Sequence, residues 1–342
     1  MAIKITKIKQ ILVSPTRYDW SKVGADITKG CYTSYEKAKA IYVWLAENIS
    51  YDTSYSIHDA DTAWKRKKGV CQAYCELFYR IGVACNLDVR IVTGHGRGRA
   101  SVGRILEDHC WIVVNRNSVM FQQPFPEAII YEKGQEHILD DFVATKGLTA
   151  RTAIMIEPTW GAGVVEEGQF IKGKHDMSWF DVDPCWMIFT HYPKNPADQL
   201  LGELSFSPSD YKQLPYLHPS YAEYGFNAKD LLSYFIHTGS SDFPMIYPSF
   251  EKYVEFYDIP VSSVLRKGVT YEFLLAKKSN CYLAISIAHD FYLENDTSVW
   301  QISGNRCKAI IQPHKTGTMT LSIKGEESTN KYNVIIEYKI KM

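Results

Sequence analysis

The chain has 342 residues, of which 46% are hydrophobic and 22% charged, a composition typical of a globular protein with a sizeable core. Its 38 basic and 38 acidic side chains cancel, so charge gives no reason to expect nucleic acid or an acidic membrane surface as a partner. No run of about 18 consecutive apolar residues occurs, so no membrane-spanning helix is expected. A chain of this length favours two domains.

The first residues give no sign of a secretion signal. Residues 1–10 alternate apolar and polar side chains and lack the continuous apolar centre of a signal peptide. We expect a cytoplasmic protein, or an extracellular one only if a leader has been removed, and a strand-rich lead-in over residues 1–33. Eight cysteines in a chain this long do not make a disulfide scaffold, and no second cysteine pair has zinc-finger spacing. We therefore expect no metal and no cofactor.

Residues 35–50 carry apolar side chains at steps of three and four, which predicts an amphipathic helix with Ser34 as its N-cap. Residues 52–61 are polar and read as a loop.

A second helix is expected to begin at Cys71. Gly69 opens onto apolar residues at helical spacing, and this places the thiol on the first turn. Unpaired N–H groups and partial positive charge at a helix N-terminus stabilise a thiolate, so the pKa of Cys71 is predicted to be low and Cys71 to be a nucleophile. The structural alternative is a small buried core cysteine.

Two later segments offer partners for this thiol. Residues 107–114 predict a short buried strand with His109 near its start, and residues 154–157 predict a strand that ends in Glu157 before proline and glycine. A thiol nucleophile needs a base, and the base needs an acceptor that holds its ring. Cys71, His109 and Glu157 supply these groups, although a buried core histidine and a strand-end glutamate are the structural alternatives.

A second histidine competes for the role of base. His95 lies in the glycine-rich segment 94–99, which we read as a flexible loop. His109 is the better candidate because it lies on a predicted strand and precedes Trp111.

These motifs together resemble a known family. Gly-Val-Cys-x-x-Tyr at 69–74, His-x-Trp at 109–111 and a carboxylate in Glu-Pro-Thr-Trp-Gly at 157–161 are similar to the transglutaminase-like core, a relative of papain-type cysteine proteases. Residues 178–201 narrow the resemblance to kyphoscoliosis-peptidase-like proteins. The resemblance covers residues 35–205.

The resemblance implies an α+β fold, in which a helix bearing Cys71 packs against an antiparallel sheet that carries His109 and Glu157. It also implies an oxyanion site made by the backbone N–H of Cys71 and one side-chain donor, for which Tyr51 and Trp64 are the candidates.

The sequence departs from the family pattern at three places. Glu157 stands where the family usually has Asp, and its extra methylene is expected to loosen the positioning of the carboxylate. Cys110 follows the histidine where the family usually has Ala. Residues 118–151 form an insertion between the two strands of the site.

The remaining chain has a different character. Residues 205–219 are rich in Ser, Pro and Tyr, as in a linker, and residues 228–237 predict a short helix. From residue 261 onward, β-branched and alternating runs separated by turn residues predict an all-β sandwich. We therefore expect a catalytic core over 1–205 and, over 206–342, a linker and a sandwich that could bind a protein partner.

The predicted function is that of a cysteine-dependent acyl-transfer enzyme, a peptidase or amidase acting on a protein or peptide. One alternative is a transglutaminase that joins Gln to amines, although no calcium-loop spacing supports a calcium-dependent crosslinker. The others are a weakly active or inactive binding or scaffolding protein on the same fold, and an amidase acting on glycans or cell-wall peptides.

Overall fold

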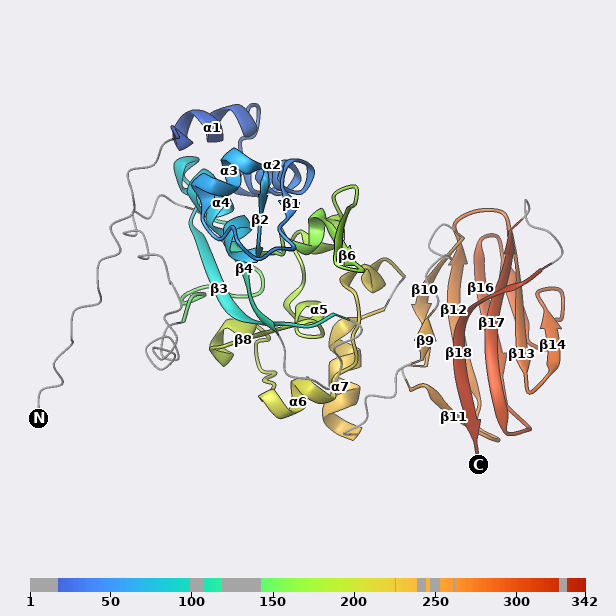
Figure 1. Ribbon diagram of the computed structural model, residues 1–342. Helices are drawn as coiled ribbons and strands as arrows, with labels where there is room; N and C mark the ends of the chain where they lie inside the picture. The colour runs from blue at the N-terminus through green and yellow to red at the C-terminus, as the bar shows by residue number, and fades with distance from the viewer. Residues whose placement is uncertain are drawn as a thin grey trace, which may run out of the picture. The chain divides into compact units, whose positions relative to one another are not determined.

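The computed structural model describes residues 18–98, 107–118, 143–224, 226–238, 244–246, 253–260, 262–325 and 331–342. The chain divides into two compact units, residues 1–212 and 213–342 (Figure 1). The domain boundary predicted after residue 205 falls inside the first unit. Most of the predicted insertion, residues 119–142, lies outside the described residues.

Helices open the described part of the first unit. They are α1 (Trp20–Ile27), α2 (Ser34–Asn48), α3 (Ala60–Arg66) and α4 (Cys71–Ala84). α1 corrects the expected strand-rich lead-in where that region is described, since Asp19 caps a helix there by accepting from the N–H of Lys22. α3 likewise replaces the end of the predicted loop, because Asp59 caps it at the N–H of Thr62.

α2 begins with a capping box one residue before the predicted N-cap. The Thr33 hydroxyl accepts from the N–H of Glu36 at 3.1 Å, and the Glu36 carboxylate accepts from the N–H of Thr33 at 2.9 Å. Ser34 is therefore the first helical residue rather than the cap.

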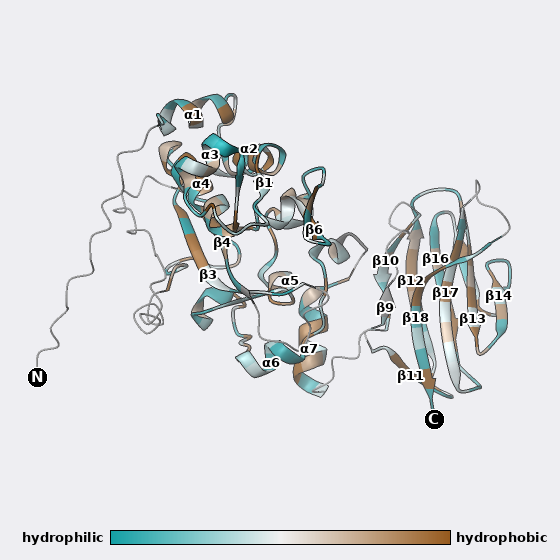
Figure 2. Cartoon of the chain, in the orientation of Figure 1, coloured by the Kyte–Doolittle hydropathy of each residue, from teal (hydrophilic) through white to brown (hydrophobic). Residues whose placement is uncertain are grey.

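The core of the first unit is an antiparallel sheet in the order β5-β4-β3-β8. Its strands are β3 (Val89–Gly96), β4 (Glu107–Asn115), β5 (Ala153–Ile156) and β8 (His191–Pro193). α4 packs against β3 and β4, and the residues it buries are Ala73, Tyr74, Cys75, Leu77, Phe78, Tyr79, Ile81 and Gly82. Hydrophobic colour on β3 is confined to its first half, so the apolar core ends where the strand reaches the polar residues of the site (Figure 2). The predicted α+β arrangement is confirmed.

A short parallel pair, β1 (Ser50–Tyr51) with β2 (Lys68–Gly69), leads into α4. Asp52 follows β1 and is fully buried. Its carboxylate accepts from the backbone N–H groups of residues 54, 56 and 57 and pairs with Lys68 at 3.0 Å. These contacts fix the backbone on both sides of the segment that precedes Cys71.

Residues 94–99 were expected to form a flexible glycine-rich loop, but their described part, residues 94–98, is not one. Gly94–Gly96 belong to β3, and Arg97 is 1% exposed. The Arg97 guanidinium donates to the carbonyl oxygens of Phe189 at 3.1 Å and Tyr211 at 2.7 Å. It therefore ties the end of the sheet to the chain that follows β8.

Short elements complete the first unit: η3 (Trp160–Ala162), β6 (Gly163–Glu166), β7 (Gln169–Lys172), η4 (Met177–Trp179), α5 (Pro184–Met187), η5 (Pro196–Gln199) and, at its end, α6 (Pro208–Gln213). β6 and β7 form a hairpin directly after the strand that leads to Glu157.

The second unit is rich in strands, as predicted. It opens with η6 (Pro219–Tyr224) and α7 (Ala228–Thr238), which matches the helix predicted at 228–237. One sheet has the order β10-β12-β16-β15, and the other has the order β11-β18-β17-β13-β14 with β9 beside β18. The strands are β9 (Met245–Ile246), β10 (Val254–Asp258), β11 (Val264–Arg266), β12 (Tyr271–Lys277), β13 (Cys281–Ile287), β14 (Asp290–Leu293), β15 (Trp300–Ser303), β16 (Arg306–Ile311), β17 (Gly317–Gly325) and β18 (Asn333–Lys341).

The two sheets meet through buried rings, because Phe273 of one sheet lies 5.5 Å from Tyr338 of the other, centroid to centroid. This arrangement fits a sandwich. Within the described ranges, no helix is both long and apolar enough to cross a membrane.

The capping box gives a local stability prediction. Thr33→Ala removes the hydroxyl that accepts from Glu36, which should destabilise the start of α2 by about 1 kcal/mol and speed amide exchange there about fivefold. Hydrogen-exchange mass spectrometry of a peptide spanning residues 33–48 measures the change. Thr33→Ser keeps the acceptor and should exchange like the wild type, and equal rates in all three proteins would contradict the role of this cap.

Candidate active site

Cys71 is the first residue of α4, behind an N-cap, Val70, that offers no side-chain hydrogen bond. The thiol is partly exposed, and His109 and Cys110 both affect its pKa, so it lies near both side chains. The predicted nucleophile thus lies at a helix N-terminus and in contact with the predicted base.

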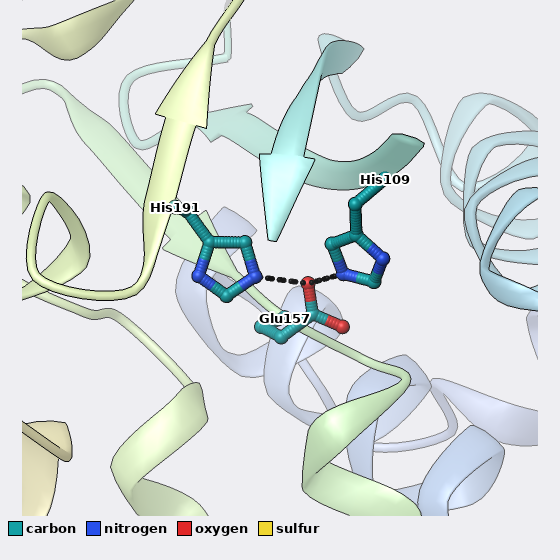
Figure 3. Close-up of side chains that lie close together, drawn as sticks. All are labelled: His109, Glu157 and His191. Atoms are coloured by element: carbon teal, nitrogen blue, oxygen red, sulfur yellow. Dashed lines mark hydrogen bonds and ion pairs between the residues drawn. The ribbon is translucent and has the colours of Figure 1, made fainter. Parts of the chain in front are cut away.

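His109 lies on β4 with its Nε2 atom 2.8 Å from Oε2 of Glu157 (Figure 3). Because Nε2 is occupied by the carboxylate, Nδ1 is the ring nitrogen that remains for the Cys71 thiol. A glycine makes room for this ring: a Cβ atom at Gly96 would lie 3.2 Å from Cγ of His109 and 3.3 Å from Trp160. The other candidate base, His95, faces Asp108 at 3.6 Å instead.

Glu157 directly follows β5 and is fully buried. Its Oε1 accepts from the backbone N–H of Thr159 at 2.9 Å and of Trp160 at 3.1 Å, while Oε2 lies between His109 and His191. The expectation that the extra methylene loosens this carboxylate is therefore wrong, since the side chain folds back onto the N–H groups two and three residues ahead. Those bonds fix its position within the turn.

His191, the first residue of β8, was not expected from the sequence in this site. Its Nε2 lies 3.3 Å from Oε2 of Glu157, and the side chain is fully buried (Figure 3). The ring packs against three indoles, with centroid distances of 4.5 Å to Trp160, 5.2 Å to Trp111 and 5.7 Å to Trp179. The sequence signal was its place in His191-Tyr192-Pro193, within the stretch 178–201 that resembles kyphoscoliosis-peptidase-like proteins.

Donor atoms of His109, Glu157 and His191 all lie within 4.8 Å of one another, and residues of these types also serve as metal ligands in proteins. Here both Nε2 atoms lie near the same carboxylate oxygen, with a hydrogen bond from His109 at 2.8 Å and a closest approach of 3.3 Å from His191.

Glu157, His109 and His191 strongly affect one another's pKa values. Burial alone would raise the pKa of Glu157, but the two histidines hold it well below its usual range. Burial alone would lower the pKa of His109, yet the Glu157 carboxylate and then Cys71 raise it to about 10. For His191 burial prevails over the carboxylate and lowers the pKa to about 4, so this ring is neutral at pH 7.

The pKa of the Cys71 thiol is raised, whereas the sequence predicted that it would be low. A hydrogen bond with Cys110, followed by burial, raises the pKa of Cys71, and the opposite effect of His109 does not compensate. Cys110 is itself 8% exposed, and Cys75 and burial raise its own pKa. The low pKa predicted from the helix N-terminus is therefore wrong for the free protein, because a second thiol occupies the place where the family usually has Ala.

The two oxyanion candidates lie in different surroundings. Tyr51 is paired in register with Gly69, two residues before the nucleophile. Trp64 stacks on Trp44 with a centroid distance of 4.7 Å, and the Lys67 ammonium lies 3.6 Å above its ring centroid. Trp64 is thus part of an aromatic and cationic cluster on α2 and α3.

Removing the second thiol should activate the first. In Cys110→Ala, Cys71 keeps its contact with His109 and loses the hydrogen bond that favours the protonated form, so its pKa should fall. A fall of one unit gives about a tenfold faster alkylation of Cys71 by iodoacetamide at pH 7. Mass spectrometry locates the adduct, and Cys31→Ala serves as the control. An unchanged rate would show that Cys110 does not set the reactivity of Cys71.

The raised pKa of His109 makes stability depend on alkaline pH. A proton bound more tightly in the folded state stabilises the fold fully below the ordinary value of 6.5, and this contribution is lost as pH rises towards about 10. The melting temperature of the first unit should therefore fall between pH 7 and pH 9. His109→Gln should have a flatter pH dependence over the same interval. Parallel curves for the two proteins would contradict the charge pairing of His109 with Glu157.

Comparison with known proteins supports the family expectation. Residues 21–119 match the family model described as the transglutaminase-like superfamily. This match includes Cys71 and His109 and ends before Glu157 and His191.

Two curated proteins named kyphoscoliosis peptidase are similar to this chain. The one from Homo sapiens is 24% identical over 191 residues, and the one from Mus musculus is 22% identical over 188 residues. Each alignment covers 52% of this chain and 23% of the relative, so the chain spans about a quarter of the length of these proteins.

A solved structure described as the crystal structure of a TGase aligns with 36% of this chain and 35% of its own, at 14% identity and a TM-score of 0.22. Residues 21–119 are thus similar to the transglutaminase-like superfamily, and the α+β core of the first unit agrees with that similarity.

Proposed function

We propose that this protein is a cysteine-dependent acyl-transfer enzyme that hydrolyses peptide or amide bonds. The supporting observation is the 2.8 Å contact between Nε2 of His109 and the buried carboxylate of Glu157, with His109 close enough to the Cys71 thiol at the start of α4 to affect its pKa. In this proposal Cys71 is the nucleophile, His109 the acid and base, and Glu157 the group that orients the ring.

The reaction would begin with attack of the Cys71 sulfur on the carbonyl carbon, while the thiol proton passes to Nδ1 of His109. The backbone N–H of Cys71 and one side chain would stabilise the oxyanion, and the register with Gly69 favours Tyr51 over Trp64 for this role. His109 then gives its proton to the leaving amine, and a thioester on Cys71 remains. Water attacks the thioester, His109 takes the proton from this water, and collapse releases the acid and the thiol.

The same thioester would yield a crosslink if an amine replaced water. The curated relatives are named peptidases, which favours hydrolysis, and we infer a protein or peptide as the substrate. The use of the 213–342 unit to bind a protein partner, and a cytoplasmic location, stay predictions.

One observation favours the alternative of a weakly active binding protein. The raised pKa of Cys71 leaves little thiolate in the free protein at pH 7. The proposed enzyme would therefore need the thiol of Cys71 to turn from Cys110 towards His109 when substrate binds.

The proposal is tested with the full chain and a fluorescent, unfolded protein such as labelled casein, with and without a fluorescent primary amine. We expect release of small fragments without amine incorporation, and a loss of at least about a thousandfold in Cys71→Ala. Cys31→Ala, which removes a partly exposed cysteine between α1 and α2, is the matched control. Amine incorporation would favour the transglutaminase, and equal activity of Cys71→Ala and wild type would refute a cysteine enzyme.

A further inference from the structure

We propose that His191 is a positioning residue, which holds the Glu157 carboxylate in the orientation that engages His109. This inference rests on the proposed function, since it assigns a role in the same site. It adds a fourth side chain, from a strand that lies outside the segment matched by the family model.

The geometry of the carboxylate carries the inference. Oε2 of Glu157 is 2.8 Å from Nε2 of His109 and 3.3 Å from Nε2 of His191 (Figure 3). The backbone N–H groups of Thr159 and Trp160 fix Oε1, so the position of Oε2 depends on the two histidines. Nε2 of His191 is buried and has Oε2 as its near polar neighbour, although it is not aligned for a hydrogen bond, and the close ring limits rotation of the carboxylate away from His109.

The contacts on the other side of the ring decide which nitrogen of His191 carries the proton. Nδ1 of His191 is 2.9 Å from the hydroxyl oxygen of Thr190. If this hydroxyl donates to Nδ1, then Nε2 carries the hydrogen and donates to Glu157. The opposite tautomer would direct the Nε2 lone pair at a carboxylate oxygen, an arrangement that is repulsive. The Thr190 hydroxyl also lies 3.1 Å from the carbonyl oxygen of Met187, so it must turn its one hydrogen from Met187 to Nδ1 for His191 to serve Glu157 as a donor.

The surroundings of His191 keep it a neutral donor. Three indoles, from Trp111, Trp160 and Trp179, enclose the ring, and the ionisable groups that face it are Glu157 and His109. A second imidazolium here would compete with His109 for the charge of Glu157. A neutral His191 instead donates a hydrogen bond and leaves that charge to stabilise the imidazolium that forms on His109 during the reaction.

Two substitutions separate the hydrogen bond from the packing. His191→Leu fills the indole pocket and removes the donor, whereas His191→Gln places an amide N–H near the position of Nε2. The readout is the rate of Cys71 alkylation by iodoacetamide against pH, because it depends on His109 and requires no substrate.

In His191→Leu the Glu157 carboxylate is free to turn away from His109, so we expect the pH at which His109 controls alkylation to fall by about one unit, a tenfold change in its proton affinity. In His191→Gln we expect the wild-type profile, with melting temperatures recorded for all three proteins. Equal shifts in both variants, or no shift in a folded His191→Leu, would overturn the positioning role.

Turnover distinguishes failure of this inference from failure of the proposed function. If casein hydrolysis occurs, His191→Leu should lower kcat about tenfold or more with KM little changed, and His191→Gln should restore kcat. The wild-type protein could have no hydrolytic activity while the alkylation rate of His191→Leu against pH still differs from that of wild type and His191→Gln. In that case the proposed function is wrong, and the positioning of Glu157 by His191 is supported. Loss of kcat in both variants with unchanged alkylation profiles would show that His191 acts only through the packing of the pocket.

Discussion

The arrangement of the candidate site depends on one buried carboxylate. Glu157 has no exposed surface, and an unpaired charge in such a place is costly. Four groups compensate it: the backbone N–H groups of Thr159 and Trp160 and the rings of His109 and His191. Because these groups come from β4, β8 and the turn after β5, satisfying the carboxylate also fixes how the ends of those strands lie relative to one another.

This constraint explains why a glutamate can stand where the related family usually has Asp. The longer side chain reaches back to the N–H groups of its own turn, and Oε2 still lies within hydrogen-bonding distance of His109. The second histidine then restrains the oxygen that the extra methylene would otherwise leave free to rotate. The departure from the family pattern and the presence of His191 are thus consistent with each other.

The site favours the charged form of His109 but not the charged form of Cys71. Glu157 gives His109 a strong preference for its charged form, whereas Cys110 and burial favour the protonated form of Cys71. The thiols of Cys71, Cys75 and Cys110, from α4 and β4, affect one another's pKa values, and for Cys71 the effect of Cys110 opposes that of the helix N-terminus. The reactivity of Cys71 therefore depends on a neighbour from the sheet as much as on its place in the helix.

Much of the fold was predictable because the apolar periodicity of α2, α4 and the central strands is strong. α1 was missed although Trp20, Val23 and Ile27 lie at helical spacing, because the segment is only eight residues long, and α3 because its seven residues are mostly polar. The N-cap of α2 was misplaced by one residue because Thr33 and Ser34 are both good caps. The contact between His109 and Glu157 was expected from the resemblance to the transglutaminase-like core, and the pairing of β4 with β5 brings it about. The role of His191 could not be predicted, because it arises from the pairing of β8 with β3 across about a hundred residues of chain.

The central claim, that Cys71 forms a thioester with the help of His109, is tested most directly by trapping that thioester. Wild-type protein and His109→Ala would be exposed briefly to p-nitrophenyl acetate, quenched in acid and analysed by mass spectrometry of intact protein and peptides. We predict one acetyl group on Cys71 in the wild type and a much slower reaction in His109→Ala. Acetylation of Cys71 at equal rates in both proteins, or no acetylation of Cys71 in the wild type, would contradict the account.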